Sequence, residues 1–432
     1  MLDKHFKGMY TYFVSKINFL TSLFFYHHKA QAVAKKATHE QTRIHNTQLV
    51  FSTIYERGEV SRAEIARITR LTRPTVSDVV AELMDEGLIE EVGHAPSTGG
   101  KRAILLRVDT SSRCLIGLDL AREDFRGALI DLRGDIHHRA SLPLPGNDGE
   151  AALNLVYTLV DALVAAAQHP LLGIGIGTPG LVDAVDGIIY QAVNLNWHDV
   201  HLQDLLEARY QLPVYMANDC QVAALGEYTF GENNRSKDLV VIHIGKGVGA
   251  GIVLGGRLFH GNPLGAGEIG HVTVVEDGEP CQCGNVGCLE TLINNRGIVR
   301  RARALATDMP QSMLNQLAPD PEAITFETLR QAFDAGDEAA RQVIHEVGQH
   351  LGAAAASLVG ILGGCRILIA GRLLCFGQFL LDAMKEELTR RSLAALSQAS
   401  EVDFVSLGGD IVLRGAAALL MHYELGLFPF RR

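Results

Sequence analysis

The stretch from Gly261 to Glu290 constrains the chain most, because it gathers enough ligands to bind one metal ion. A histidine is followed there by a compact C-x-C-x4-C pattern, which gives four candidate ligands: His271, Cys281, Cys283 and Cys288. One imidazole and three thiolates complete the tetrahedral shell of a structural zinc site, which leaves no coordination position open. The spacing therefore predicts a structural Zn2+ ion that organises a loop and performs no chemistry itself.

The competing interpretation of these cysteines is a redox pair or a disulfide. Two thiols separated by a single residue are poorly placed to bridge each other, and nothing else in the sequence indicates an oxidising compartment. The other four cysteines stand in apolar or strand-like contexts and are expected to be buried thiols: Cys114, Cys220, Cys365 and Cys375. We therefore favour zinc.

Two carboxylates flank the predicted metal ligands. Glu268 stands three residues before His271, and Glu290 stands two residues after Cys288. An ion that fixes these ligands also fixes the carboxylates, which can accept hydrogen bonds from hydroxyl groups. The histidine ring can bind metal through one nitrogen and a hydroxyl through the other. The pattern predicts a surface that binds a sugar, although either glutamate alone would be expected to be merely solvated.

Residues 1–38 form an unusual N-terminal extension, expected to be poorly ordered. The segment from Tyr10 to Tyr26 is aromatic and apolar, but Lys16 and Asn18 interrupt it, so it is too short and too polar to span a membrane. A basic start, an apolar middle and a small-residue motif imitate a signal peptide. We interpret the extension as dispensable or as the result of a start codon placed too early; an interfacial anchor is the second interpretation.

Residues 39–108 have the pattern of a winged helix-turn-helix domain. A first helix ends near Gly58, and Ser61 to Glu64 forms a capping box for a second helix that turns Ile65 and Ile68 inward. Thr72 and Pro74 start a third helix, whose apolar residues follow the i, i+3, i+4, i+7 rule: Val76, Val79, Val80 and Leu83. Residues 88–92 and 103–108 are then the two strands of the wing.

The charges of this domain favour DNA as its partner. Arginines crowd the second helix and the start of the third, whereas acidic residues lie behind them. A recognition helix enters the major groove with its N-terminal residues, and a wing tip contacts phosphate or the minor groove. The candidate DNA-binding residues are Arg62, Arg73, Thr75, Ser77, Lys101 and Arg102. A module that only dimerises is the weaker alternative.

The rest of the chain repeats one order of elements. The segment CLIGLDLAREDFRGALIDLRGDIHHR, from Cys114, predicts three strands joined by a polar loop and a turn, and LVVIHIGKGVGAGIVLGGRLFHG, from Leu239, repeats that order. Such a degenerate duplication predicts two lobes that each open with a β-meander and face a cleft. We assign the first lobe to residues 109–230 and the second, with the zinc loop and the C-terminal helices, to residues 231–432.

A longer motif carries a family resemblance. The segment IGKGVGAGIVLGGRLFHGNPLGAGEIGH, from Ile244 to His271, followed by CQCGNVGCLE, resembles the signature of the ROK family of repressors, open reading frames and sugar kinases. The resemblance extends from about Cys114 almost to the C-terminus. Within the family, the chain resembles the xylose, N-acetylglucosamine and glucose type of repressor. It implies an α/β fold: a two-lobed, actin-like ATPase domain of the ROK sugar-kinase type behind the winged helix. By resemblance the sugar site would comprise Asn194, Asn218, Asp219, Glu268, His271 and Glu290, with Gly177 nearby.

The nucleotide side departs from the kinase pattern. Asp219 matches the general base of ROK kinases, but where these carry Asp-x-Gly-Gly-Thr this chain has residues Asp119 to Glu123, whose side chains should block and repel a triphosphate. Ala370-Gly371-Arg372 replaces a triple glycine. The second phosphate loop keeps its glycines but has Lys246 in place of the usual threonine. This change does not decide whether the loop binds phosphate, because lysine also binds phosphate.

These patterns predict a sugar-responsive transcriptional repressor of carbohydrate-metabolism genes that is not an enzyme. It would be a cytoplasmic homodimer or homotetramer on a double-stranded, palindromic operator, without a membrane partner, and its effector would be a free hexose, pentose or amino sugar. A net charge of −10 argues against wholesale binding of nucleic acid but allows a small DNA-binding domain. Three alternatives stay open: an active ROK sugar kinase with a DNA-binding appendage, a repressor controlled by a protein partner, and an activator.

Overall fold

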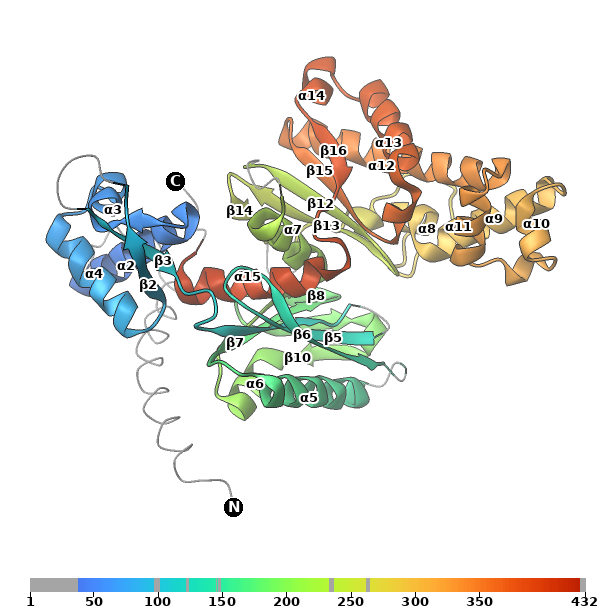
Figure 1. Cartoon of the computed structure of the whole chain (residues 1–432). Coiled ribbons are helices and arrows are strands. Elements are labelled where there is room, and N and C mark those ends of the chain that lie inside the picture. Colours follow the sequence, from blue (N-terminus) through green and yellow to red (C-terminus); the bar gives the residue numbers. More distant parts are fainter. Residues whose placement is uncertain are drawn as a thin grey trace.

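The computed structural model describes residues 38–96, 102–121, 124–144, 146, 149–232, 237–261 and 265–427. Figure 1 shows a small N-terminal domain beside a body of two lobes. Of the extension predicted for residues 1–38, residues 1–37 lie outside the described residues, whereas Thr38 caps the first described helix.

The N-terminal domain is the expected winged helix. Its elements are α2 (His39–Arg57), β1 (Val60–Ser61), α3 (Arg62–Thr69), α4 (Arg73–Asp85), β2 (Ile89–His94) and β3 (Ile104–Val108). The strands form one sheet in the order β1-β3-β2. All four apolar residues predicted for one face of α4 are buried, and Thr72 caps α4 by accepting the Thr75 N–H. Periodicity and capping therefore located the recognition helix correctly.

Two details of α3 differ from the expectation. Ser61 accepts the Glu64 N–H, but the Glu64 carboxylate pairs with Arg67 at 3.4 Å instead of returning to the backbone of Ser61, so only half of the capping box forms. Ile65 is fully buried, whereas Ile68 is 37% exposed. The prediction that Ile68 points inward was wrong, because this eight-residue helix buries only one apolar side chain.

The body contains two five-stranded sheets with the same topology. Their orders are β11-β7-β4-β5-β6 and β16-β15-β12-β13-β14, so each meander pairs in the same way with two parallel strands. The strands of lobe 1 are β4 (Cys114–Asp119), β5 (Asp124–Ile130), β6 (Ile136–Pro143), β7 (Leu171–Thr178) and β11 (Val214–Asn218). Those of lobe 2 are β12 (Leu239–Ile244), β13 (Val248–Leu254), β14 (Arg257–Leu258), β15 (Arg366–Gly371) and β16 (Glu401–Phe404). The predicted duplication is confirmed.

Helices and a small sheet complete both lobes. Lobe 1 adds α5 (Gly149–Ala166), β8 (Leu181–Asp183), β9 (Ile188–Ala192), η1 (Val193–Leu195), β10 (Trp197–Val200), α6 (Leu202–Tyr210) and α7 (Asp219–Phe230). Lobe 2 adds η2 (Ile269–His271), α8 (Leu289–Ile293), α9 (Asn295–Asp308), α10 (Met313–Leu317), η3 (Pro321–Ala323), α11 (Phe326–Asp334), α12 (Glu338–Leu362), η4 (Arg372–Phe376), α13 (Gly377–Arg391), α14 (Ala394–Gln398) and η5 (Gly408–Asp410). The last helix of the described residues is α15 (Ile411–Leu425).

Among the described helices, α5 is long and apolar enough to span a membrane by composition. Its buried residues include Val156, Leu159 and Leu163, which belong to the apolar core that β4 and β5 also line. We therefore interpret α5 as a cover for the lobe 1 sheet.

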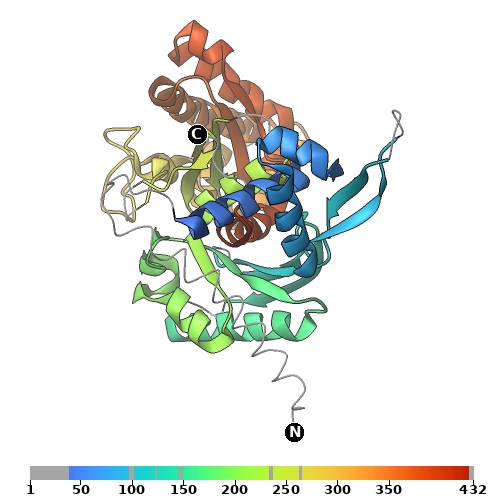
Figure 2. The same cartoon turned by 90° about the vertical axis from the view of Figure 1, so that its left-hand side faces the viewer.

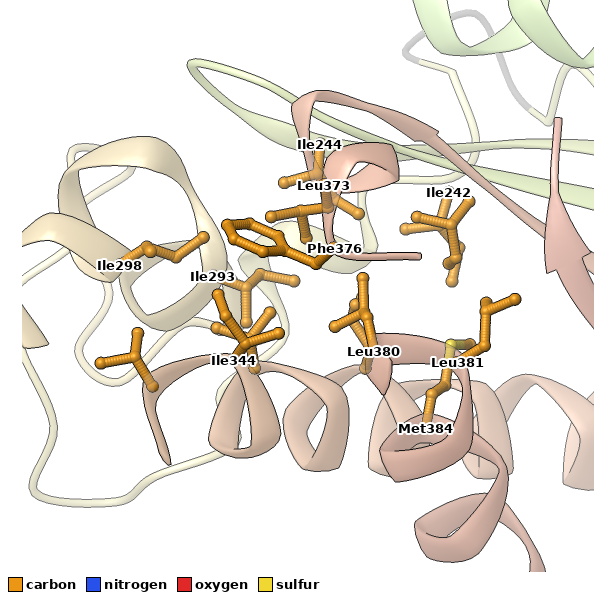
Figure 3. Close-up of a cluster of buried hydrophobic side chains, with 14 of the residues drawn as sticks. Ile242, Ile244, Ile293, Ile298, Ile344, Leu373, Phe376, Leu380, Leu381 and Met384 are labelled. Atoms are coloured by element: carbon orange, nitrogen blue, oxygen red, sulfur yellow. The ribbon is translucent and has the colours of Figure 1, made fainter. Parts of the chain in front are cut away.

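The core of lobe 2 holds the segment that follows the predicted metal loop. Ile293, at the end of α8, lies in one buried cluster with Ile242 and Ile244 of β12, Phe376 and Ile344 (Figure 3). Because α8 begins directly after Cys288, its residue Glu290 is fixed by the loop on one side and by this core on the other.

The last helix, α15, belongs to both lobes and to the DNA-binding domain. It follows β16 of lobe 2 but lies on the lobe 1 sheet, so close that a Cβ on Gly175 of β7 would stand 1.9 Å from the Ala416 carbonyl oxygen. Only glycine permits this approach. Leu420 and Met421 then join the buried cluster of the winged helix, which includes Phe51 (Figures 1 and 2). The boundary at residue 231 therefore does not describe the packing of α15.

Tyr55 fastens the winged helix to lobe 1. Its hydroxyl donates to the Leu132 carbonyl at 2.8 Å, and the Arg133 guanidinium lies 4.5 Å from its ring centre. Burial raises the pKa of Tyr55 to about 12, so the hydroxyl stays protonated as a donor. This contact makes the orientation of the domain depend on lobe 1.

We expect Tyr55→Phe to lower the free energy of unfolding by about 1 kcal/mol, because it removes the donor and leaves the Leu132 carbonyl without that partner. Denaturant unfolding of the full chain measures the change. Tyr157→Phe in α5 is the matched control, and an equal loss in the two variants would contradict the role given to Tyr55.

Candidate metal centre, carboxylate cluster and nucleic-acid interface

The four predicted metal ligands converge. The ligand atoms of His271, Cys281, Cys283 and Cys288 all lie within 4.8 Å of one another. The Cys281 Sγ is 3.5 Å from the His271 Nδ1, and the two other sulfur atoms are 3.7 Å apart. A tetrahedral zinc ion, with bonds of about 2.0–2.3 Å, would hold its ligand atoms about 3.3–3.8 Å apart. The donor set and its spacing therefore fit a metal ion of this size.

Tight turns bring these ligands together. The chain doubles back through the bridges Thr273–Cys288 and Pro280–Val286. Gly287 has a φ of +69°, and a Cβ on it would lie 1.6 Å from the Val275 carbonyl oxygen, so no other residue fits this crossing. Gly287 therefore permits the close crossing that brings the metal ligands together.

A second group gathers beside the metal ligands; we call Asp219, Glu268 and Glu290 the carboxylate cluster. The Glu268 carboxylate lies 3.9 Å from the Nε2 of His271, the ring nitrogen that faces away from the sulfur atoms. Burial raises the pKa of Glu268, and the charges of Asp219 and Glu290 raise it further, while His271 lowers it. Asp219 of α7 and Glu290 of α8 thus both act on Glu268, which directly precedes η2.

Asn218 and Asp219 stand where β11 meets α7. Asn218 caps α7 by accepting the Cys220 N–H at 2.9 Å, and its amide donates to the Gly180 carbonyl at 3.1 Å. This fixes the start of α7, so the Asp219 carboxylate is held at the helix N-terminus. Asn218 serves the structure here, in addition to any contact with a ligand.

Glu290 has a structural role that the sequence did not indicate. Its Oε2 accepts the Val248 N–H at 2.9 Å, next to the glycine turn between β12 and β13. Asn294 supports the same turn by donating to the Lys246 carbonyl. Glu290 therefore connects the carboxylate cluster to the second phosphate-type loop.

The two remaining residues expected near a sugar, Asn194 and Gly177, have surroundings that differ from those of the carboxylate cluster. Asn194 is exposed in η1. Gly177 is packed beneath α15, because a Cβ on it would stand 2.4 Å from a methyl carbon of Val412. We therefore interpret Gly177 as a packing residue.

The first phosphate hairpin is closed by an ion pair. Asp119 is fully buried, and one of its oxygens accepts from the Arg126 guanidinium at 2.6 Å while the other accepts the Ala121 N–H. Arg126 also donates to the Gly409 carbonyl. An acidic residue that a kinase would need near phosphate and metal is thus occupied by a cation of the chain itself. Arg122 and Glu123 lie outside the described residues.

The segment that replaces the triple glycine of the kinases, Ala370-Gly371-Arg372, also carries a side chain in place of glycine. Gly371 has a φ of +104° and lies so close to the Ile244 carbonyl oxygen that a Cβ would stand 1.9 Å away. The following Arg372 places its guanidinium 5.9 Å from the ring centre of Phe326. A side chain therefore stands where the kinase pattern has glycine.

The winged helix exposes three of the six predicted DNA-binding residues. Arg73 and Ser77 are exposed on the first turns of α4, and Arg102 is exposed beside the wing. Thr75 is partly buried, and its hydroxyl bonds to that of Thr72. Lys101 lies outside the described residues.

Arg62 is placed less favourably for DNA than expected. Its guanidinium pairs with Glu91 of the wing strand at 3.0 Å. We therefore expect Arg62 to brace the wing against α3 rather than to contact DNA.

Sequence reasoning missed two residues beside Asp219. The His243 Nδ1 lies 3.6 Å from one Asp219 oxygen, and the Cys220 Sγ lies 3.9 Å from the other. The signal was available for His243, since it is the one polar residue in the apolar strand LVVIHI.

A winged helix joined to a two-lobed body with a candidate ligand site is typical of one class of protein, the DNA-binding regulators that respond to a small molecule. The model of the ROK family matches residues 115–422, and that of the MarR family matches residues 49–103. The chain belongs to the ROK family, and with its DNA-binding domain it is a sugar-responsive transcriptional repressor of that family.

Individual relatives agree with this assignment. The chain is 32% identical over 389 residues to the xylose repressor of Caldicellulosiruptor bescii, covering 89% of this chain and 97% of the relative. It is 32% identical over 383 residues to the DNA-binding transcriptional dual regulator NagC of Escherichia coli, covering 87% and 93%. The crystal structure of a ROK family transcriptional regulator, a homologue of the E. coli MLC protein, superimposes with a TM-score of 0.81 at 27% identity and covers 90% of this chain and 98% of the other.

Kinases are similar over the body alone. A glucokinase of Halalkalibacterium halodurans is 34% identical over 321 residues, which is 73% of this chain and 97% of the kinase. The winged helix therefore distinguishes the two groups, whereas the body is common to both.

Proposed function

We propose that this repressor binds a neutral sugar at the carboxylate cluster and transfers no phosphoryl group. The observation that carries the proposal is the contrast between the carboxylate cluster and the first phosphate hairpin. The Glu268 carboxylate lies 3.9 Å from the Nε2 of His271 and interacts with the charge of Asp219, whereas Asp119 is buried and paired with Arg126. A site that keeps hydroxyl acceptors and fills its phosphate hairpin suits a sensor better than a kinase.

The effector is a free hexose, pentose or amino sugar. Carboxylates and an imidazole bind hydroxyls, while three acidic residues repel a sugar phosphate. The names of the relatives support this class of effector. One relative is a xylose repressor, and the N-acetylglucosamine repressors of Escherichia coli and Shigella flexneri are as similar to this chain as NagC is.

The metal of the loop is a structural Zn2+. Three thiolates and one imidazole form a closed shell, and such ions stabilise a fold without binding substrate. Zinc on the Nδ1 of His271 leaves the Nε2 directed toward Glu268 and available to a sugar hydroxyl.

Sugar binding reaches the DNA-binding domain through the joint before α15. Buried Glu227 of α7 accepts from the backbone N–H groups of Ser406 and Leu407, and Arg126 donates to the Gly409 carbonyl. These contacts hold the crossing from lobe 2 to α15, which ends in the core of the winged helix. Sugar that binds one lobe arrangement better than the other therefore changes the position of the winged helix.

The protein acts in the cytoplasm as a homodimer or homotetramer, whose paired winged helices bind a palindromic operator. On binding sugar it releases the operator, so the regulated genes are transcribed when their substrate is present.

Calorimetric titration with D-glucose, D-xylose and N-acetylglucosamine, each with and without AMPPNP, tests the sensor against the kinase. We expect one sugar to bind and the nucleotide analogue to leave its affinity unchanged. Binding of AMPPNP, or sugar-dependent release of ADP from ATP, would favour an active kinase with a DNA-binding appendage, which the similarity to glucokinase and the retained glycines around Lys246 also support.

Arg73→Ala should weaken operator binding about tenfold, or about 1.4 kcal/mol, because Arg73 is exposed at the N-terminus of α4. Fluorescence anisotropy with a labelled duplex, selected by the protein from a random pool, measures the change. Arg43→Ala removes another exposed arginine, from α2, as a control. Loss of sugar affinity in the Arg73 variant would indicate misfolding and contradict its role in DNA binding.

A further inference from the structure

A second set of metal-binding side chains lies apart from the cysteine loop. The ligand atoms of Asp219, Cys220 and His243 all lie within 4.8 Å of one another. The carboxylate of Asp219 is central, with one oxygen 3.6 Å from the His243 Nδ1 and the other 3.9 Å from the Cys220 Sγ. Oxygen, nitrogen and sulfur donors thus converge from α7 and β12.

The elements that carry these donors are fixed before any ion binds. Asp219 and Cys220 occupy the first turn of α7, which Asn218 caps. His243 lies on β12, the central strand of the lobe 2 sheet, paired on both sides. A cation would therefore find its ligands close to their final positions, and the site would require little reorganisation.

Histidines, rather than lysines or arginines, pair with the carboxylates at this point in the described part of the chain. Among the described residues the ion-pair partners of Asp219 and Glu268 are imidazoles, those of His243 and His271 respectively. No lysine or arginine of the described part forms an ion pair with either. A carboxylate that is buried, as Asp219 is, and whose ion-pair partner among the described residues is a histidine favours a bound cation.

We propose that Asp219, Cys220 and His243 form a second site for a soft or borderline divalent cation such as Zn2+, at the floor of the carboxylate cluster. Imidazole and thiolate select zinc and similar ions over Mg2+ or Ca2+. Three protein ligands leave one coordination position, which Glu268 or water completes. The cation is bound as an ion, with release of the thiol proton to solvent.

This second site makes the repressor sensitive to metal, a consequence that rests on the function proposed above. A sugar hydroxyl and the cation would use the same carboxylate of Asp219. Zinc at the second site therefore lowers sugar affinity, and saturating sugar lowers the affinity for the second zinc by the same factor.

The test is a metal count on the full chain. Protein stripped with a chelator is titrated with Zn2+, freed of loosely bound metal by gel filtration and analysed by elemental mass spectrometry. We expect two zinc ions per chain in the natural protein and one in each of Cys220→Ser and His243→Gln. Cys114→Ser, which removes a buried thiol of β4 far from both metal sites in the sequence, should retain two.

Two further measurements complete the experiment: the absorption spectrum on titration with Co2+ and the affinity for sugar. The second equivalent of Co2+ should add thiolate-to-cobalt absorption in the natural protein but not in Cys220→Ser, and thermal unfolding shows whether both variants are folded. The affinity for the sugar that binds best among D-glucose, D-xylose and N-acetylglucosamine should fall about tenfold between the one-zinc and two-zinc forms.

One zinc per chain at saturation, or a second zinc kept by both variants, would overturn the site. Two zinc ions with an unchanged sugar affinity would overturn the shared use of Asp219. If no sugar binds the one-zinc form, the proposed function fails, while the metal count still decides the second site.

Discussion

Cys281→Ser is expected to release the loop metal and to reduce sugar affinity at least about 100-fold. A serine hydroxyl is a poor substitute for a thiolate, so the shell of His271, Cys283 and Cys288 is left incomplete. Structural zinc contributes about 10–16 kcal/mol in zinc-finger peptides at neutral pH, and losing even part of this energy should unfold a loop that buries few apolar side chains. The loop between η2 and α8 has exposed valines, among them Val272 and Val286, so little else holds it.

The loss should reach the sugar because the ligands and the carboxylates share one short segment. His271 is three residues from Glu268, and Cys288 is the residue from which α8 and Glu290 start. Elemental analysis measures the metal and calorimetry the sugar. Cys365→Ser, a buried thiol before β15, is the control and should preserve both. Normal sugar affinity in a metal-free Cys281→Ser protein would refute the organising role of the ion.

Asp219→Asn is expected to weaken sugar binding about 100-fold, or about 2.7 kcal/mol, which is the range of a hydrogen bond to a charged group. The amide has nearly the same shape, so α7 should keep its cap from Asn218. It carries no charge and presents one acceptor oxygen instead of two. In a sensor the change should abolish the response to sugar while operator affinity without sugar stays unchanged.

Calorimetry and anisotropy on the same preparation separate these effects. Asp161→Asn on α5, where the carboxylate pairs with Arg209 at 2.8 Å, is the surface control. An Asp219→Asn protein that binds sugar normally would place the effector somewhere other than the carboxylate cluster.

The sequence predicted those features of the protein that depend on residues close together in the chain. The recognition helix follows from the spacing of its valines and from the cap at Thr72, and both are as expected. The metal ligands follow from a spacing of a few residues, and the four donor atoms converge. The duplicated meander revealed two lobes because the repeated segments have the same order of strands. The family resemblance supplied the actin-like architecture.

What the sequence did not reveal depends on residues far apart in the chain. Arg126 bonds to the Gly409 carbonyl across 283 positions, and α15 leaves its own lobe to lie on the other sheet. No spacing indicates such contacts. Arg62 was expected to face DNA because arginine is common there, but Glu91, from the wing, pairs with it. Hydrophobic periodicity cannot identify the partner of a charged residue.

The measurement that tests the central claim most directly is the release of DNA by sugar. The labelled duplex is bound by protein that carries one zinc ion per chain, and D-glucose, D-xylose and N-acetylglucosamine are titrated in separate experiments without any nucleotide. The account predicts that one of these sugars lowers DNA affinity by at least about tenfold, or about 1.4 kcal/mol of coupling energy, and that ATP changes nothing. If DNA is released only when ATP is added, or if a bound sugar leaves DNA affinity unchanged, the sensor account is contradicted.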